Sequence, residues 1–330
     1  MDTLHQNVEL SLEDERVLLT AATSAPSLHN SQPWSFDLHD DRLTIYADPS
    51  RQLTRTDPAG RSLLISCGAA LFNVRVAAEH LGFHPRVRLL PDADDQTLVA
   101  SIRFGRRQVH VAGLAGYYRA VAARRTNRLP FHDRSIPHAA LASMGEAARA
   151  ENALLRIYDD PDEVARIVEL LHEADRAEAH DPAVRVERQA WIGGPQRADG
   201  IPVRSLGPRP SAPTAPFRDL GRGVDVSRES ARFEQAPTVA ILSTRHDERV
   251  DWVRAGQALQ RVLLEATRAG LAASFMNQPL EQEALRGLVR SPVSGVGHSH
   301  MIMRMGYGDP VPMTPRRPLS AVRRHGSRTS

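Results

Sequence analysis

The stretch GAALFNVRVAAEHLG, residues 68–82, returns in a related form as GQALQRVLLEATRAG at residues 256–270. Six of the fifteen positions are identical at a constant offset of 188, and both stretches end on a glycine, as helices often do. Alanine and leucine are common in helices, so coincidence is the alternative explanation. Because both stretches also share small residues on one face and precede strand-like sequence, we favour an internal duplication.

Periodic segments around the repeat predict a mixture of helices and strands. In the first part of the chain we predict a helix over residues 13–22 with Ser11 as its N-cap, two strands between 34 and 48, a helix from 58 to about 81, and strands at 86–90 and 98–104. Further on we predict a helix at 114–123, a strand at 238–243, a short helix at 285–289 and a strand at 301–305. The tail from residue 315 is rich in arginine and proline and lacks periodicity.

A long insert between residues 178 and 236 interrupts the second part of the chain. Nine prolines or glycines fall between residues 193 and 213, with few apolar side chains among them. A structureless loop of this length is uncommon inside a compact domain and usually serves as a lid, a binding loop or a linker. Because the sequence after it matches that of the first half, we predict a lid.

The composition excludes several classes of chemistry. All 42 basic residues of the 330 are arginine, so the chain has no lysine for a Schiff base, a pyridoxal phosphate anchor or a P-loop. The single cysteine, Cys67, excludes disulfides, thiolate zinc fingers and cysteine-ligated iron–sulfur clusters, and we expect it to be inert core. The small net charge of +3 favours an anionic small molecule over a nucleic acid as ligand.

The sequence also gives no indication of a membrane span or a metal site. Its N-terminus is acidic where a signal peptide is basic, and no apolar run approaches the roughly 20 residues that cross a bilayer, so we expect a cytoplasmic protein. His298 and His300 have no carboxylate nearby in sequence, and the ELLHE stretch at residues 169–173 lacks the second histidine of an HExxH zinc motif.

The segment from Ser24 to Trp34, SAPSLHNSQPW, is the most specific candidate for a binding site. Within six positions it gathers Ser27, His29, Asn30 and Gln32, whose side chains can form hydrogen bonds with a ligand. In an average turn such residues only satisfy their own backbone. Here Pro33 fixes the exit of the turn and Trp34 would anchor it in the core, which favours a turn that presents these groups to a ligand.

Three further segments are ambiguous when each is taken alone. Arg124-Arg125-Thr126-Asn127-Arg128 offers guanidinium donors and a hydroxyl, which phosphate groups favour, but a solvated basic helix end is the simpler interpretation. Pro315-Arg316-Arg317-Pro318 by itself indicates a mobile basic tail. The stretch from Gly270 to Pro279 indicates a helix end that leads into a polar loop with Asn277 and Gln278.

Together the four segments resemble motifs of the nitroreductase superfamily, and more closely of its Acg-type branch of fused pseudo-dimers. The motif Ala-Pro-Ser-x-x-Asn-x-Gln-Pro-Trp occurs at residues 25–34 without a mismatch, and an Arg-Arg-Ser-x-Arg motif matches residues 124–128 with threonine in place of serine. The loop at 270–278 and the closing Pro-Arg-Arg-Pro at 315–318 also match motifs of this superfamily, and these two matches are informative only together with the first two. The resemblance implies an α+β fold, an internally duplicated pseudo-dimer with central antiparallel sheets flanked by helices and a long lid loop. Its halves would span residues 1–113 and 114–330, the second containing the insert at about 178–236.

The resemblance implies one FMN held between the two halves, with NAD(P)H as reductant. Arg124, Thr126 and Arg316 would hold the phosphate, with Arg125 and Arg317 as neighbours, and Arg128 would reach the ribityl chain or the pyrimidine edge. Ser27, His29, Asn30 and Gln32 would approach the isoalloxazine from the other half. The loop Met276, Asn277 and Gln278 would set a backbone N–H near N5, although the family often has Glu-Gly at that loop.

The distribution of the motifs predicts one flavin per chain. The Asn-x-Gln-Pro-Trp motif lies in the first half and the Arg-rich motif in the second, so neither half carries both and a monomer completes a single site. The implied function is an FMN oxidoreductase that passes hydride from NAD(P)H to a nitroaromatic, quinone or similar small acceptor, with no side chain as an essential acid. One alternative is a lid-covered FMN-binding protein with little reductase activity. Another is a nucleic-acid or scaffold protein, which the small net charge disfavours.

Overall fold

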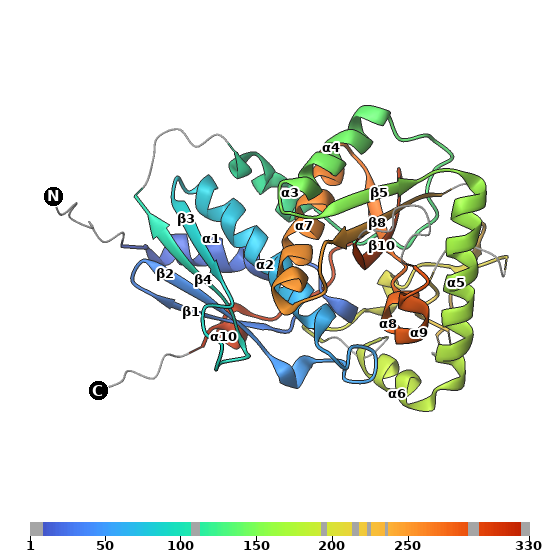
Figure 1. The fold of residues 1–330 in the computed structure, drawn as a ribbon, viewed down its shortest axis with the longest axis horizontal. Helices are drawn as coiled ribbons and strands as arrows, with labels where there is room; N and C mark the ends of the chain where they lie inside the picture. Colours follow the sequence, from blue (N-terminus) through green and yellow to red (C-terminus); the bar gives the residue numbers. More distant parts are fainter. Residues whose placement is uncertain are drawn as a thin grey trace.

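Two four-stranded antiparallel sheets enclose a pair of long helices in the computed structural model (Figure 1). The structure describes residues 9–106, 113–192, 197–212, 218–222, 226–234, 237–289 and 297–324. Parts of the predicted lid, the first eight residues and the end of the tail lie outside these described residues. Helix α2 (Arg61–His80) packs on the first sheet and α7 (Arg249–Arg268) on the second, and the two helices pack on each other.

The first half follows the predicted order of elements. Helix α1 (Leu12–Thr23) begins at a capping box between Ser11 and Asp14, β1 (Trp34–His39) and β2 (Arg42–Ala47) form a hairpin, and β3 (His84–Leu89) and β4 (Leu98–Gly105) complete the sheet β1-β2-β4-β3. Two short 3-10 helices, η1 (Leu28–Asn30) and η2 (Pro49–Arg51), flank the hairpin. Helix α2 starts three residues later than predicted because Gly60 adopts a left-handed φ of 72° and the Asp57 carboxylate caps the first turn at Leu63 N.

The second half repeats the arrangement of the first. Its sheet contains β5 (Leu154–Tyr158), β8 (Thr238–Thr244), β9 (Ala272–Phe275) and β10 (His298–Gly306), in the order β5-β8-β10-β9. Helix α4 (His138–Arg149) precedes β5 as α1 precedes β1, and α7 lies between β8 and β9 as α2 lies between β2 and β3. The matching order supports the predicted internal duplication and the α+β class.

The repeated glycines lie where the two central helices cross. A Cβ on Gly68 would lie 2.2 Å from the carbonyl oxygen of Val253, and a Cβ on Gly256 would lie 2.0 Å from that of Ile65. Each of these distances is too short for any side chain, so only glycine permits the close approach of the two backbones. The residues that revealed the repeat therefore form its pseudo-symmetric contact.

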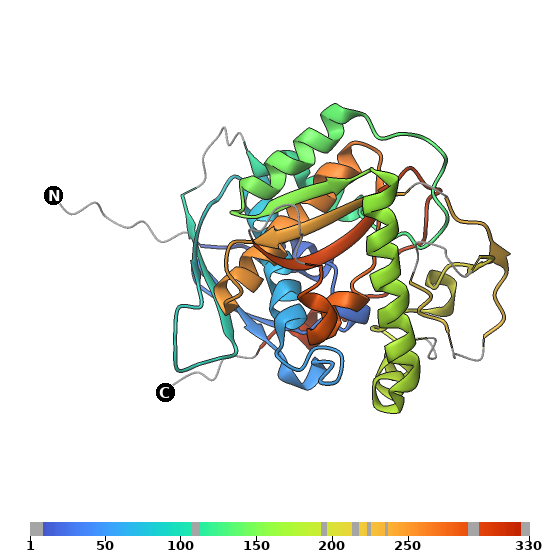
Figure 2. The same cartoon turned by 45° about the vertical axis from the view of Figure 1, so that its right-hand side comes forward.

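The insert stands between β5 and β8, at the position where the first half has the tight β1–β2 hairpin. The prediction of a structureless loop from residue 178 was wrong for its first part, because α5 (Pro161–His180) continues into it and α6 (Pro182–Trp191) follows, each beginning with an aspartate cap and a proline. Beyond α6 it holds η4 (Val203–Ser205), the two-residue strands β6 (Arg209–Pro210) and β7 (Ser230–Ala231), and a small apolar core of Ile192, Ile201, Leu206 and Leu220. Figure 2 shows this part projecting beyond α5.

Two chain segments cross between the halves. After η3 (Leu114–Tyr117) and α3 (Tyr118–Ala123), the Arg-rich segment reaches the second sheet, where Thr126 forms a bridge with Ala273. The C-terminal tail returns to the first sheet, where Arg323 pairs with Phe36, and the tail predicted to lack structure contains a short helix, α10 (Leu319–Val322). The predicted short helix at 285–289 is replaced by α8 (Gln278–Glu281) and α9 (Glu283–Arg286).

Helix α2 corrects one expectation about apolar runs. By its length and composition this helix could cross a membrane, whereas we expected no apolar segment long enough to do so. Within the molecule 83% of its apolar window is buried between α1, the first sheet and α7, which is the environment of a core helix.

Candidate functional site

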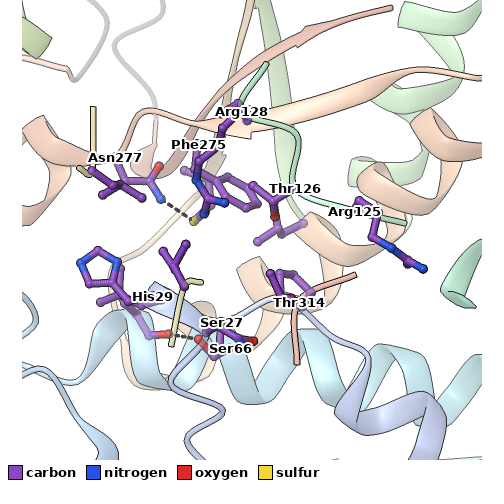
Figure 3. A pocket seen from close by; sticks show the side chains of 18 of the residues that line it. Ser27, His29, Ser66, Arg125, Thr126, Arg128, Phe275, Asn277 and Thr314 are labelled. Atoms are coloured by element: carbon purple, nitrogen blue, oxygen red, sulfur yellow. Dashed lines mark hydrogen bonds between the residues drawn. The ribbon is translucent and has the colours of Figure 1, made fainter. Parts of the chain in front are cut away.

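One cavity lies at the junction of the two halves and the insert, with a volume of about 1030 Å³ that includes its mouth. Because that figure counts space open to solvent, the residues that line the wall, and not the volume, make this cavity the candidate binding site. The wall contains the turn at 26–30, the first turns of α2, the segment 124–128, the end of β9, the tail at 312–316 and three insert residues. Figure 3 shows Ser27, His29 and Ser66 on one side of it and Thr126, Phe275 and Asn277 on the other.

Nine of the thirteen residues expected at a cofactor line this cavity. They come from all four motifs and are Ser27, His29, Asn30, Arg124, Arg125, Thr126, Arg128, Asn277 and Arg316. The contacts among the motifs are direct: the Arg316 Nη1 donates to Asn30 Oδ1 at 3.0 Å, and Arg124 and Arg316 both donate to the carbonyl oxygen of Ser24 at 3.4 Å. Segments about 100 and 290 residues apart in sequence thus meet at one place.

The remaining four expected residues lie outside the cavity wall. Gln32 is fully buried and bonds Ala198 O at 2.9 Å and Arg317 N at 2.8 Å, so it fastens the insert and the tail to the turn. Arg317 itself donates to the carbonyl oxygens of Gln32 and Trp34. Neither side chain is among the residues that line the cavity.

The other two belong to the loop after β9. Met276 is buried in the core, and its N–H donates to Ile302 O at 2.9 Å, so a backbone N–H offered to a flavin by this loop would come from another of its residues. Gln278 donates to Asp175 on α5 at 3.0 Å. Asn277 does line the cavity, while its Oδ1 accepts the Ile302 N–H at 2.8 Å and thereby fixes the loop against β10.

The turn that carries Ser27, His29 and Asn30 is held in an unusual backbone conformation. His29, Asn30 and Gln32 have φ values of 47°, 56° and 51°, in the left-handed region that side-chain-bearing residues rarely occupy. The Ser27 hydroxyl accepts the Gln32 N–H at 2.9 Å, and the buried Trp34 fixes the exit. Such strain is stable only where the surroundings hold it, and it turns Asn30 toward both the tail and the insert, which contacts it at Gly200.

Arg124 is buried and Arg316 is half-buried near it, and among the described residues neither forms an ion pair with a carboxylate. Arg124 is 4% exposed, and its Nε and Nη1 have no hydrogen-bond partner, nor does the Nε of Arg316. Burial, reinforced by Arg316 and Arg125, lowers the pKa of Arg124 to about 9, and burial and Arg125 lower that of Arg316 to about 10. An anion bound between them would supply the missing hydrogen bonds and reverse the unfavourable electrostatics.

The side chains of Arg125 and Arg128, although close in sequence, point in different directions and have different hydrogen-bond partners. The guanidinium of Arg125 points away from the other labelled side chains in Figure 3 and bonds the carbonyl oxygens of Ala122 and Arg124. Arg128 points the other way along the cavity wall, where its Nη1 donates to Ser205 O of the insert at 3.0 Å. Burial and the neighbouring Arg218 lower the pKa of Arg128 to about 10.

His29 is a neutral imidazole in this site. Burial lowers its pKa well below 6.5, and Arg218, Arg128 and Arg188 lower it further, so the ring carries no charge at neutral pH. It is 5% exposed and its Nε2 has no partner. A neutral imidazole can accept or donate one hydrogen bond at this position, but it cannot serve as a strong acid.

Several wall residues were not foreseen from the sequence. Ser62, Ile65 and Ser66 lie on the first turns of α2 and Leu259 lies on α7, so a search of the repeated helices themselves could have found them. Phe275 and Met301 lie on adjacent strands and add apolar surface. Ile201, Arg218 and Leu220 come from the insert, where no motif marks them.

Two other groups of residues set aside in the sequence remain apart from the cavity. His300 is buried on β10 with its Nε2 2.5 Å from the Thr244 hydroxyl, and among the described residues no cluster of three potential metal ligands occurs. Cys67 is fully buried, its thiol contacts Pro33 O, and burial raises its pKa, as expected of an inert core cysteine.

Comparison of this chain with known proteins identifies the family to which it belongs. Residues 121–307 match the model of the nitroreductase family. A Mycobacterium tuberculosis protein provisionally named as an NAD(P)H nitroreductase is 34% identical over 94% of this chain and 91% of its own length, and the one provisionally named NAD(P)H nitroreductase acg is 31% identical over 91% and 92%. Among solved structures, the FMN-dependent nitroreductase NfnB of Mycobacterium smegmatis, in complex with NADPH, covers 65% of this chain and all of its own at 19% identity and a TM-score of 0.38.

Proposed function

Because the chain belongs to the nitroreductase family, we propose that it is an FMN-dependent oxidoreductase that takes hydride from NAD(P)H and passes it to a nitroaromatic, quinone or similar acceptor. The single observation that carries the proposal is the cavity in which Arg124 and Arg316 meet the Asn30 turn, because Nε and Nη1 of Arg124 and Nε of Arg316 have no hydrogen-bond partner among the described residues. The names of the relatives support NAD(P)H as the reductant.

The residues of the cavity fit an FMN. The phosphate dianion matches the free donors of Arg124 and the Nε of Arg316, with Thr126 and Thr314 as nearby hydroxyls. The hydroxyls of Ser27, Ser62 and Ser66 suit a polyhydroxylated chain, and the apolar side chains that follow suit a flat aromatic ring. These apolar residues are Ile65, Leu259, Phe275 and Met301.

A bound flavin supplies the hydride chemistry, and the chain supplies binding, orientation and electrostatics. Arg124 and Arg316 would bind the phosphate, and the left-handed turn would hold Asn30 and His29 against the ring or the bound acceptor. Because His29 is neutral and no carboxylate lines the described part of the wall, the chain offers hydrogen bonds and positive potential there rather than a general acid. Apolar side chains would exclude water from the reacting face.

The second candidate function is FMN binding with little turnover, and the insert favours it. The Gly200 N–H donates to Asn30 O, and the Asn30 side chain donates to Gly200 O. The Gln32 side chain donates to Ala198 O, and Asp199 forms an ion pair with Arg51. A cover fastened at these points would shield the flavin from both nicotinamide and acceptor unless it opens.

Two measurements separate these functions. After reconstitution with FMN, a visible spectrum and a flavin-to-protein ratio test cofactor binding, and a colourless chain refutes both candidates. Anaerobic mixing with NADPH then decides between them, because rapid bleaching of bound FMN supports the reductase and an unchanged spectrum over minutes supports the covered binding protein.

Stoichiometry and chain organisation complete the proposal. We propose one FMN per chain in a cytoplasmic monomer, with halves that divide at about residue 113, because the fused halves already provide the second wall of the site. The ratio of flavin to protein and the mass from sedimentation equilibrium test this part, and two flavins per chain or a dimer would contradict it.

A further inference from the structure

The cavity contains a second group of cations, apart from the pair assigned to the phosphate. Arg128 and Arg218 both line the wall. They lie close enough to each other and to His29 that Arg218 lowers the pKa of Arg128, and both lower the pKa of His29. The charges that act on Arg124 are instead Arg316 and Arg125. The arginines that line the cavity therefore form two groups, and a single phosphate bound by the first group does not neutralise the second.

Arg218 is held rigidly by carboxylates outside the wall. Its Nη2 donates to Glu178 Oε1 and to Glu281 Oε2, both at 2.6 Å, and its Nη1 donates to Glu281 Oε1 at 2.7 Å. Glu178 also accepts from Arg188 at 2.9 Å. Arg218 is 7% exposed and its Nε has no hydrogen-bond partner. Its guanidinium is thus oriented before any ligand arrives, which reduces the entropy lost on binding.

Carboxylates balance Arg218 but not Arg128. Glu178 and Glu281 pair with Arg218, Glu178 also pairs with Arg188, Asp175 adds a third negative charge near Arg218, and none of the three carboxylates is among the lining residues. Arg128 has no carboxylate partner and donates only to a carbonyl oxygen among the described contacts. Because a buried cation without a counter-ion is unfavourable, this end of the cavity favours an anionic oxygen group.

The same insert supplies apolar surface beside Arg218. Ile201 and Leu220 are buried side chains that line the cavity, and Leu220 lies two residues from Arg218 in the chain. A ligand that satisfies both features has a flat apolar body and an anionic substituent.

We propose that Arg218, with Arg128 and His29 beside it, makes the acceptor site selective for aromatic acceptors that carry an anionic oxygen group such as a carboxylate. The inference rests on the proposed function and adds a substrate class to it. Arg218 is a specificity-determining residue in this proposal, and the insert contributes to recognition as well as cover.

The test compares two ligands of the same shape and different charge, 4-nitrobenzoate and 4-nitrobenzamide, titrated into the FMN-loaded oxidised protein and followed by calorimetry. We expect the carboxylate to bind at least tenfold more tightly, because hydrogen bonds to a charged group contribute about tenfold to hundredfold in affinity. The ratio of kcat/KM for the two ligands should follow the same preference. Equal affinities would overturn the inference.

Variants assign the preference to Arg218. Arg218→Met combined with Glu281→Gln removes the cation together with the carboxylate that it would leave unpaired, and the preference should fall about tenfold, whereas Arg218→Lys should retain most of it. Arg149→Met combined with Glu146→Gln, which removes an exposed ion pair of α4 and also leaves the net charge unchanged, is the matched control and should leave the ratio unchanged. An unchanged ratio in the double variant, with a folded chain by circular dichroism, would overturn the inference.

Two further outcomes identify where a failure lies. If the double variant weakens NADPH binding and leaves the ligand ratio unchanged, the anion at Arg218 belongs to the nicotinamide cofactor and the inference is wrong. If FMN does not bind to the wild-type chain, the proposed function fails at reconstitution, before any ligand is added, and this inference fails with it. FMN binding without a charge preference refutes only the inference.

Discussion

Replacing Arg124 by methionine should stabilise the chain without cofactor and weaken FMN binding at the same time. The side chain is buried beside two other arginines, and the lowering of its pKa to about 9 corresponds to at most about 5 kcal/mol against the charged form. Methionine removes this cost, loses one long hydrogen bond to Ser24 O worth about 1 kcal/mol, and fills similar volume. We expect the apoprotein to gain about 1–3 kcal/mol in free energy of unfolding.

The effect on the cofactor has the opposite sign. Two free donors of Arg124, Nε and Nη1, can bind a phosphate, and charge-assisted hydrogen bonds contribute about 1.5–3 kcal/mol each. Losing them should weaken FMN binding by roughly hundredfold or more. Urea denaturation of the apoprotein and quenching of flavin fluorescence on titration measure the two effects.

The control is Arg149→Met on the exposed face of α4, which should change the free energy of unfolding by less than about 0.5 kcal/mol and leave FMN affinity unchanged. If Arg124→Met lowers the stability of the apoprotein and binds FMN as tightly as the wild type, the pair of Arg124 and Arg316 is a structural feature and no anion site.

Three other predictions concern the scaffold. Burial and a neighbouring arginine lower the pKa of His300 to about 3, so below pH 6.5 this histidine binds a proton in the unfolded chain but not in the folded one. The free energy of unfolding should therefore fall by about 2 kcal/mol between neutral pH and pH 5. His300→Gln should reduce this dependence on pH in denaturation experiments. Gly256→Ala should cost about 3 kcal/mol or more because its Cβ would meet Ile65 O, whereas Gly287→Ala, with open space around it, should change the melting temperature little; equal effects would contradict the helix crossing. Gln32→Ala should cost about 1–3 kcal/mol in urea denaturation and speed proteolysis of the insert, since the hydrogen bonds of the buried Gln32 amide to Ala198 O and Arg317 N are lost. Unchanged cleavage would show that the insert is fastened elsewhere.

The sequence by itself determined most elements of the first half and the identity of the motifs. Ser11 caps α1 as predicted, the hairpin turns at residues 40–41, and the repeat around Gly68 and Gly256 indicated two equivalent halves. These features depend on neighbours in the chain or on the recurrence of residues, and both can be read without coordinates. The motif at 25–34 also indicated where ligand-binding groups gather.

Which motif residues face the cavity was decided only by the tertiary structure. Gln32 and Asn30 lie two residues apart in the same motif, yet Gln32 is buried away from the cavity while Asn30 lines its wall. Both residues have left-handed φ values on either side of the right-handed Ser31, and this turn is held in place by contacts with the insert and the tail. Arg218 bears no sequence signal, since its role depends on Glu178 and Glu281, 40 and 63 residues away. Motifs specify residue types over short distances, but a buried charge acquires its function from partners that only the folded chain brings together.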